Sequence, residues 1–223
     1  MAPGKKHSNP KAKISSEPAQ PPPNWPIFKP LLPASDLSLE TVVDSQIIEL
    51  PLTTTPGKPK KDEALRVNDR FQVTDEAFAN RLWIETGLRE LICGNGESED
   101  EGEEVMGEGE RKELWGGEPV GLNPKIRIYR YSKGQFFGQH YDESNVMTLN
   151  TKPTSTPVKT TWTILLYLTS PATGCQGGET VFYPDDLPGK KNVLEKEIVI
   201  GLETGMLLLH KHGNECMLVS ILV

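Results

Sequence analysis

The stretch Ile126-Arg-Ile-Tyr-Arg-Tyr-Ser-Lys-Gly-Gln-Phe-Phe-Gly-Gln-His-Tyr-Asp142 decides the fold class and holds the first chemical clue. Its apolar and polar residues largely alternate, which is typical of β-strands with one buried face. His140 and Asp142 close the stretch. Residues i and i+2 of a strand point to the same face with Cα atoms about 7 Å apart. The spacing therefore brings an imidazole and a carboxylate within reach of one metal ion.

This pair of side chains matches part of a known kind of iron site. Non-haem iron(II) oxygenases hold the metal on two His and one carboxylate and leave the other positions open. His140 and Asp142 would supply two of these three ligands. A His-x-Asp pattern alone is a weak signal, because three-residue matches arise by chance in unrelated chains. The third ligand must come from elsewhere in the chain.

Six strand-like segments follow one another in the second half of the chain, separated by glycine, proline and aspartate. They are 126–132, 135–142, 161–169, 178–183, 197–202 and 205–212. Short strands in succession, preceded by a helix, favour an antiparallel sandwich or jelly roll that is mainly β with supporting helices. The polar connection 143–160 is longer than a hairpin needs and begins directly after Asp142, so we expect a lid over the site.

One helix is expected from Asp75 to Leu91. Thr74 is a suitable N-cap, and acidic residues in the first turn suit the positive end of the helix. Apolar residues at three- and four-residue steps predict the face that packs on the sheet. These residues are Phe78, Leu82, Ile84, Leu88 and Leu91. Gly87 weakens the second half of the helix, because glycine costs about 1 kcal/mol relative to alanine.

The length of 223 residues is suited to one domain with tails. Residues 1–27 are rich in lysine and proline and are expected to be a disordered tail, which leaves one domain over 28–223. Residues 96–112 are expected to form a disordered acidic insert, because they hold a run of eight acids without a base. These acids exceed the net charge of −7, so the rest of the chain is nearly neutral. A nucleic-acid partner is therefore not expected.

The location of the protein is predicted from its apolar runs and its cysteines. No run approaches the roughly 20 apolar residues of a membrane span, and the start lacks the apolar stretch of a signal peptide. Cys93, Cys175 and Cys216 are odd in number and widely spaced, which argues against a disulfide framework and against a thiolate zinc site. We expect an intracellular protein, cytoplasmic or nuclear, without a membrane partner.

Further motifs surround the His-x-Asp pair. They are Val67-Asn-Asp-Arg-Phe-Gln72, Val120-Gly-Leu-Asn-Pro124, the Tyr-x-Tyr-x-x-Gly of residues 129–134, Thr161-Trp-Thr-Ile-Leu-Leu-Tyr-Leu-Thr169, Gly177-Gly-Glu-Thr-Val-Phe182 and Gly205-Met-Leu-Leu-Leu-His-Lys-His-Gly213. With these motifs the chain from about Phe28 onward resembles the prolyl 4-hydroxylase-like family of 2-oxoglutarate/iron(II) dioxygenases.

The resemblance implies a double-stranded β-helix, a jelly roll whose mouth holds iron(II). In it, His140 and Asp142 match two iron ligands, and Tyr131 matches a tyrosine that binds the 2-oxoglutarate carboxylate. Thr163 matches a threonine of the same pocket. The implied activity is hydroxylation, with iron(II), 2-oxoglutarate and ascorbate as cofactors and a protein or peptide as substrate.

The same resemblance exposes a missing third ligand. Val219 stands where similar sequences have the distal histidine, and the basic residue for the far carboxylate of 2-oxoglutarate has no match. We therefore expect a jelly roll that lacks its last strand. Two interpretations stay open. Either His210 or His212 substitutes as the third ligand, or Val219 and the residues after it come from a retained intron or a mispredicted transcript.

The function expected from these observations is that of a 2-oxoglutarate- and iron(II)-dependent hydroxylase whose activity is impaired in this chain. The alternative is a non-catalytic jelly-roll module that binds a protein through its acidic insert or its proline-rich tail. The polar connection 143–160 does not indicate a substrate.

Overall fold

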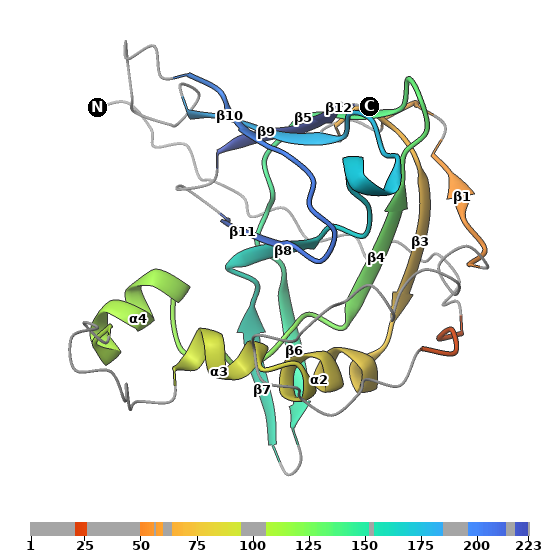
Figure 1. The fold of residues 1–223 in the computed structure, drawn as a ribbon. Coiled ribbons are helices and arrows are strands. Elements are labelled where there is room, and N and C mark those ends of the chain that lie inside the picture. Colours follow the sequence, from red (N-terminus) through yellow and green to blue (C-terminus); the bar gives the residue numbers. More distant parts are fainter. Residues whose placement is uncertain are drawn as a thin grey trace, which may run out of the picture.

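The structure is a computed structural model that describes residues 21–25, 50–55, 57–59, 64–94, 106–151, 154–184, 196–212 and 217–222. In these residues the chain is mainly β, with its strands gathered in four antiparallel sheets and a few short helices at one end (Figure 1). Most of the predicted N-terminal tail and of the acidic insert lies outside the described residues.

The largest sheet has five strands and lies across the top of Figure 1. In spatial order the strands are β10 (Ile198–Ile200), β9 (Glu179–Tyr183), β12 (Leu218–Leu222), β5 (Phe136–His140) and β2 (Arg66–Val67). Strand β12 pairs with β9 on one side and with β5 on the other. The residues after Met217 therefore fill the centre of this sheet, and β5 and β9 are not left with an open edge between them.

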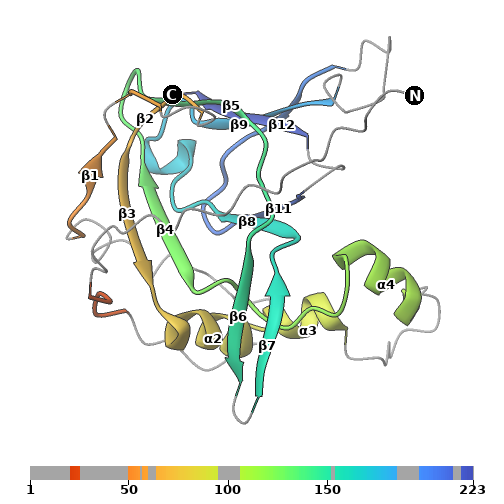
Figure 2. The ribbon, with the colours of Figure 1, turned by 180° about the vertical axis from the view of Figure 1, so that it is seen from behind.

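Two smaller sheets lie beside and below the first (Figures 1 and 2). One has the order β1 (Thr53–Thr54), β3 (Asp69–Thr74), β4 (Lys125–Arg130), and the other pairs β11 (Leu207–Lys211) with β8 (Trp162–Leu166). Within the described part of the chain, β4 pairs only with β3 and β8 only with β11. Each of these two sheets therefore ends in a strand with one edge free of a strand partner. All six predicted strand segments are confirmed, with shorter bounds.

The predicted single helix over 75–91 is wrong, because two helices stand in its place. They are α2 (Glu76–Glu85) and α3 (Leu88–Cys93). Gly87 between them has a φ of 73°, a left-handed conformation that glycine adopts without steric cost and that ends the first helix. The predicted cap is also shifted by one residue, since Asp75 rather than Thr74 accepts from the backbone N–H of Phe78 at 2.9 Å.

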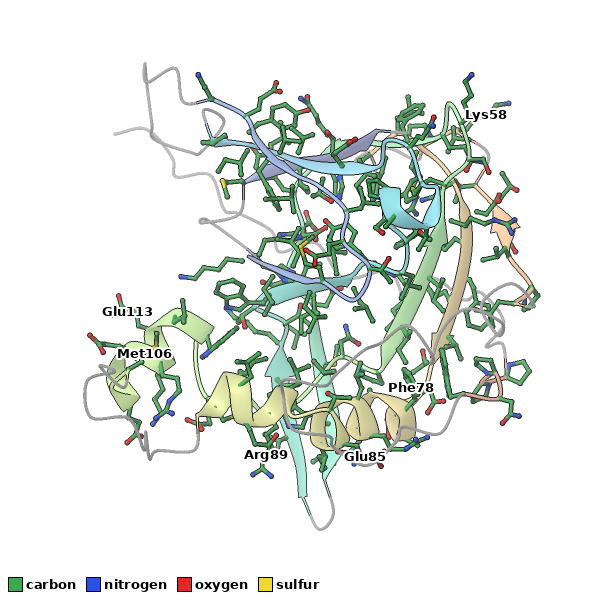
Figure 3. All side chains as sticks on the ribbon, in the orientation of Figure 1. Lys58, Phe78, Glu85, Arg89, Met106 and Glu113 are labelled. Carbon is green, nitrogen blue, oxygen red and sulfur yellow. The ribbon has the colours of Figure 1, made fainter. Side chains whose placement is uncertain are left out.

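The break in the helix changes which face is buried. The core cluster is formed by Trp83, Leu88 and Ile92, whereas Leu91, which was predicted to pack on the sheet, is 76% exposed. Because the helical backbone is interrupted at Gly87 between α2 and α3, a single periodic stripe cannot describe both. Figure 3 shows Glu85 and Arg89 pointing away from the body of the protein.

Residues 143–160, expected to be a lid, form a β-hairpin. Its strands are β6 (Val146–Thr151) and β7 (Thr154–Lys159), which pair along their full length. In both ribbon views the hairpin projects past α2 and α3, away from the five-stranded sheet (Figures 1 and 2). Residues of both strands, including Met147, Leu149 and Val158, line the cavity that also holds Asp142, while residues 152 and 153 lie outside the described residues. The lid therefore stays a prediction.

Two segments that were expected to be disordered are partly ordered. Trp25 of the predicted tail stacks on Phe78 with ring centroids 3.9 Å apart, and its indole N–H donates to Asp75 at 2.7 Å. The C-terminal part of the predicted insert begins helix α4 (Glu108–Trp115), where the side chain of Arg111 donates to the Cys93 carbonyl. Residues 21–25 and 108–112 therefore have a described structure, and disorder of the rest of the tail and of the insert stays a prediction.

Two further expectations concern the cysteines and the membrane. Cys93 and Cys175 are free thiols, and Cys216 lies outside the described residues. None of the helices in the described ranges is long and apolar enough to cross a membrane.

Candidate metal centre

His140 ends strand β5 with its two ring nitrogens in different surroundings. Nδ1 lies 2.8 Å from the carbonyl oxygen of Gly138. Because a carbonyl only accepts, Nδ1 carries the proton and Nε2 keeps its lone pair in the neutral ring. The ring of Phe137 stacks on the imidazole with centroids 3.7 Å apart and fixes its plane. Metal-bound histidines typically have this arrangement, in which a carbonyl accepts from the nitrogen that does not bind the metal.

The other nitrogen of His140 faces the carboxylate of Asp142. The distance from Nε2 to Oδ1 is 3.5 Å. Burial lowers the pKa of His140, against the opposing effect of its bond to Gly138 and of the Asp142 charge. In the neutral ring a lone pair and an anionic oxygen then face each other, and a cation between them would relieve this repulsion. The pair predicted from the sequence is therefore brought together in a form suited to a metal.

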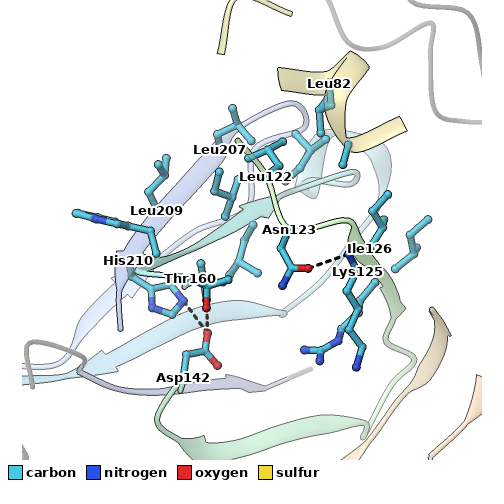
Figure 4. A pocket seen from close by; sticks show the side chains of 18 of the residues that line it. Leu82, Leu122, Asn123, Lys125, Ile126, Asp142, Thr160, Leu207, Leu209 and His210 are labelled. Atoms are coloured by element: carbon cyan, nitrogen blue, oxygen red, sulfur yellow. Dashed lines mark hydrogen bonds and ion pairs between the residues drawn. The ribbon is translucent and has the colours of Figure 1, made fainter. Parts of the chain in front are cut away.

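The second carboxylate oxygen of Asp142, Oδ2, contacts two further side chains. The hydroxyl of Thr163, on β8, donates to Oδ2 at 2.7 Å, and Nε2 of His210, on β11, lies 3.3 Å from the same oxygen. Figure 4 shows Asp142 and His210 pointing toward one another across the cavity. Thr163, predicted to line the cosubstrate pocket, thus orients a candidate metal ligand instead of presenting a free hydroxyl.

His212 has both ring nitrogens occupied by hydroxyl groups. Nε2 lies 2.7 Å from the oxygen of Thr163, and Nδ1 lies 3.3 Å from that of Thr160. Because the proton of Thr163 goes to Asp142, its oxygen accepts from Nε2–H of His212. Nδ1 of His212 is then the acceptor for Thr160, so this ring supports Thr163 and has no nitrogen left for a metal.

His210 is almost completely buried, with 7% of its surface exposed. Its Nδ1 is the one buried side-chain nitrogen or oxygen in the described part of the chain without a hydrogen-bond partner. The ring meets the edge of Phe182 with centroids 5.3 Å apart. Burial lowers the pKa of His210, and the nearby Asp142 charge opposes this effect. The imidazole is therefore held neutral beside a carboxylate.

Tyr131 lies on the same cavity as the His–Asp pair. Its hydroxyl oxygen accepts from the amide nitrogen of Asn68 at 3.2 Å, and the amide oxygen of Asn68 accepts from Thr55 at 2.9 Å, which fixes the orientation of the amide. Burial raises the pKa of Tyr131 to about 12. No hydrogen bond of the described residues uses the phenolic proton, so it can be donated to a carboxylate of a ligand.

The place of the expected third ligand is apolar. Val219 on β12 pairs directly with His140 on β5 and is 3% exposed. Directly opposite residues of two strands project their side chains on the same face. The isopropyl group therefore stands beside the imidazole where the resemblance places a histidine, and it offers no lone pair.

The donor set fits a divalent transition metal. Among the described residues, no three His, Cys, Asp or Glu side chains surround one point as a preformed metal site. The carboxylate of Asp142 contacts one imidazole with each of its oxygens. Its oxygens are 3.5 Å and 3.3 Å from the two Nε2 atoms. Ligands bound at about 2.1 Å lie about 3.0 to 3.4 Å apart at octahedral and tetrahedral angles. For all three groups to share one ion, the carboxylate would rotate and the two imidazoles would come within this distance of each other.

The cavity that holds this centre is large, with a volume of about 2570 Å³. It reaches from the helix residues Trp83 and Leu88 past β4 and β8 to the His–Asp pair. Ordinary small-molecule pockets measure about 300 to 1,000 Å³. Residues of β4 and β8, the strands with a free edge in the described part of the chain, line this space.

No family model matches the chain, and no curated protein or solved structure shows significant similarity to it. The site is therefore interpreted from its own residues.

Several residues that support the centre could not be found from the sequence alone. The carbonyl of Gly138 has no side-chain pattern that would indicate its role, and Thr160 belongs to a polar connection without a motif. Asn68 stands in the quoted Val67–Gln72 motif, which gave it no function. Its contact with Tyr131 spans 63 positions along the chain and depends on the pairing of β3 with β4.

Proposed function

We propose that this chain is a 2-oxoglutarate- and iron(II)-dependent hydroxylase of the prolyl 4-hydroxylase-like family, with impaired activity. The observation that carries the proposal is the arrangement of His140, whose Nδ1–H is bonded to the Gly138 carbonyl while Nε2 faces Asp142 at 3.5 Å. A hydrogen-bonded structural histidine would direct a proton at the carboxylate. In the neutral ring of His140 the lone pair of Nε2 is directed at it, as a metal ligand requires.

The residues of the chain have separate tasks in this proposal. His140 and Asp142 hold the metal, and Thr163 fixes the carboxylate by a 2.7 Å hydrogen bond. Tyr131 donates its free proton to a carboxylate of 2-oxoglutarate. With the metal and 2-oxoglutarate bound, dioxygen would be the oxidant: one of its oxygen atoms would hydroxylate an unactivated C–H bond and the other would enter succinate, as 2-oxoglutarate loses carbon dioxide. A protein or peptide side chain is the proposed substrate, and ascorbate would keep the metal reduced.

The sheet arrangement supports a jelly roll that lacks one strand. The order β10-β9-β12-β5 forms one wall, and β4 and β8 belong to two separate sheets that border the same cavity. A further strand between β4 and β8 would join those two sheets into a second wall. In the described part of the chain no strand occupies this place, which supports the proposal of a jelly roll without its last strand.

Impaired activity is proposed because of Val219. This buried side chain lies next to His140 and cannot bind a metal. The same observation favours a second candidate function, that of a non-catalytic jelly-roll module whose Asp142 is satisfied by Thr163 and His210 alone. In that case the chain would act by binding a protein.

A manganese(II) titration followed by electron paramagnetic resonance tests the proposal, with succinate release measured in parallel in the presence of iron(II), 2-oxoglutarate and ascorbate. We expect binding with a Kd in the micromolar to millimolar range and weak, uncoupled succinate release. The variants His140→Ala and Asp142→Asn should lose binding, and the control His7→Ala, which changes a histidine of the tail, should keep it. Absence of both binding at millimolar manganese(II) and succinate release would leave the interaction module as the better account.

A further inference from the structure

We propose that His210 is the third metal ligand of this chain and takes over the role that Val219 cannot fill. This inference rests on the proposed function and adds to it the residue that completes the ligand set. It is carried by the position and the burial of His210 and by the contact of its Nε2 with Asp142.

The position of His210 follows from the pairing of β11 with β8. His210 lies directly opposite Thr163 in this pairing, so both side chains project on the same face of the two-stranded sheet. Thr163 donates to Asp142 on that face, and Nε2 of His210 lies 3.3 Å from the same carboxylate oxygen. The imidazole thus reaches Asp142 from the side opposite to β5, where His140 is located.

His210, which lies in β11, and His212, which directly follows β11, are not equivalent. His212 uses both ring nitrogens in bonds to Thr163 and Thr160. In His210, Nε2 contacts only the carboxylate of Asp142, at 3.3 Å, while Nδ1 lies elsewhere on the ring and has no hydrogen-bond partner in the described part of the chain. Of the two candidates, only His210 can therefore turn Nε2 to a metal beside Asp142 without breaking an existing hydrogen bond to a hydroxyl.

His210 also restores the ligand chemistry that Val219 removes. Together with His140 and Asp142 it gives two imidazoles and one carboxylate, the set that leaves positions open on iron(II). The ring of His210 is 7% exposed and meets the edge of Phe182. These contacts hold the ring in place, as the stacked ring of Phe137 does for His140. The set selects a first-row divalent ion such as iron(II), manganese(II) or cobalt(II).

Manganese(II) and cobalt(II) binding to full-length variants tests the assignment without relying on activity. His210→Gln keeps a polar donor beside Asp142 and a similar volume, so it preserves a structural hydrogen bond but weakens ligation. We expect at least a 100-fold loss of manganese(II) affinity in His210→Gln and His210→Ala. In the matched control His212→Gln the loss should be tenfold or less, because His212 acts only through Thr163.

A rescue variant separates ligation from a general loss of structure. The side chain of residue 219 shares a face with His140, so His210→Gln combined with Val219→His should regain at least tenfold in manganese(II) affinity. The d–d absorption of cobalt(II) should move toward a less nitrogen-rich environment in His210→Gln and return in the double variant.

The outcomes distinguish this inference from the proposed function. If the unmodified chain binds manganese(II), His140→Ala abolishes binding and His210→Gln binds as well as the unmodified chain, the role of His210 is refuted and the proposed function stands. If the unmodified chain binds neither ion at millimolar concentration, both are refuted. A loss in His210→Gln with recovery in the double variant supports the assignment.

Discussion

Thr163→Val is the substitution that tests most sharply how this centre is held. Valine has nearly the shape of threonine but lacks the hydroxyl that donates to Asp142 at 2.7 Å and accepts from His212 at 2.7 Å. A hydrogen bond to a charged group contributes about 1.5 to 3 kcal/mol. Removing the donor frees the carboxylate to rotate and leaves Nε2–H of His212 without an acceptor.

The expected loss is measured in metal affinity. Supporting hydrogen bonds of metal ligands typically change affinity about 10- to 100-fold, which corresponds to about 1.4 to 2.8 kcal/mol. Isothermal titration with manganese(II) on the unmodified chain, Thr163→Val and Thr163→Ser gives this difference directly. Thr163→Ser retains the hydroxyl and should bind within about threefold of the unmodified chain.

Thermal unfolding without metal provides the second measurement. The free energy of unfolding of Thr163→Val should fall by about 1 to 3 kcal/mol, since a buried polar network loses a member. Equal manganese(II) affinity in Thr163→Val and the unmodified chain, with a folded protein, would refute the view that Asp142 is positioned by Thr163. A loss in Thr163→Ser as large as that in Thr163→Val would show that the hydroxyl is not the cause.

Three further predictions concern stability. Burial raises the pKa of Tyr131 to about 12, above the ordinary value of 10, so the unfolded chain loses this proton first. The free energy of unfolding should therefore fall by about 2 to 3 kcal/mol as pH rises from 10 to 12. Tyr131→Phe should lack this fall in urea unfolding over that pH range, and a pH dependence equal to that of the unmodified chain would contradict the cause. Trp83→Ala should lower the free energy of unfolding by about 3 to 5 kcal/mol in urea titration, because Trp83 anchors the core cluster at 7% exposure, and a loss below 1 kcal/mol would contradict this role. Gly138→Ala should cost about 1 to 3 kcal/mol by the same assay, because the added Cβ would lie 3.0 Å from the Leu65 carbonyl, and a neutral effect would show that β2 moves freely.

Most of the sheet could be predicted because strand patterns are local. The alternation around Ile126 to Asp142 and the apolar run near Trp162 give strands β4, β5 and β8 with small errors at their ends. The helices were harder to predict, because one glycine in a left-handed conformation changes the direction of the chain that follows it. Gly87 was recognised as a weak point from its helix propensity, but the turn that it makes could not be read from the apolar spacing.

The candidate site, too, could be predicted only in part from the sequence. His140 and Asp142 could be found because they lie two positions apart on one strand. The choice between His210 and His212 could not be made from the sequence, since it depends on which nitrogens the hydroxyls of Thr160 and Thr163 already use. Those contacts arise from the register of β11 against β8, a long-range pairing that no local pattern specifies.

Strand β12 shows a further limit of prediction from the sequence. The segment after Met217 departs from the pattern that the resemblance implies, yet β-branched and aliphatic residues suit a buried strand, and β12 pairs on both sides. Val219 therefore fits the sheet well, although it offers no group that could bind a metal.

The measurement that tests the central claim most directly is a crystal structure of the chain soaked with manganese(II), with the ion located by its anomalous scattering. The account predicts one ion bound to Nε2 of His140, a carboxylate oxygen of Asp142 and Nε2 of His210, each at about 2.0 to 2.3 Å. An ion bound elsewhere, or no ion in the cavity at a concentration that saturates the chain in solution, would contradict the account.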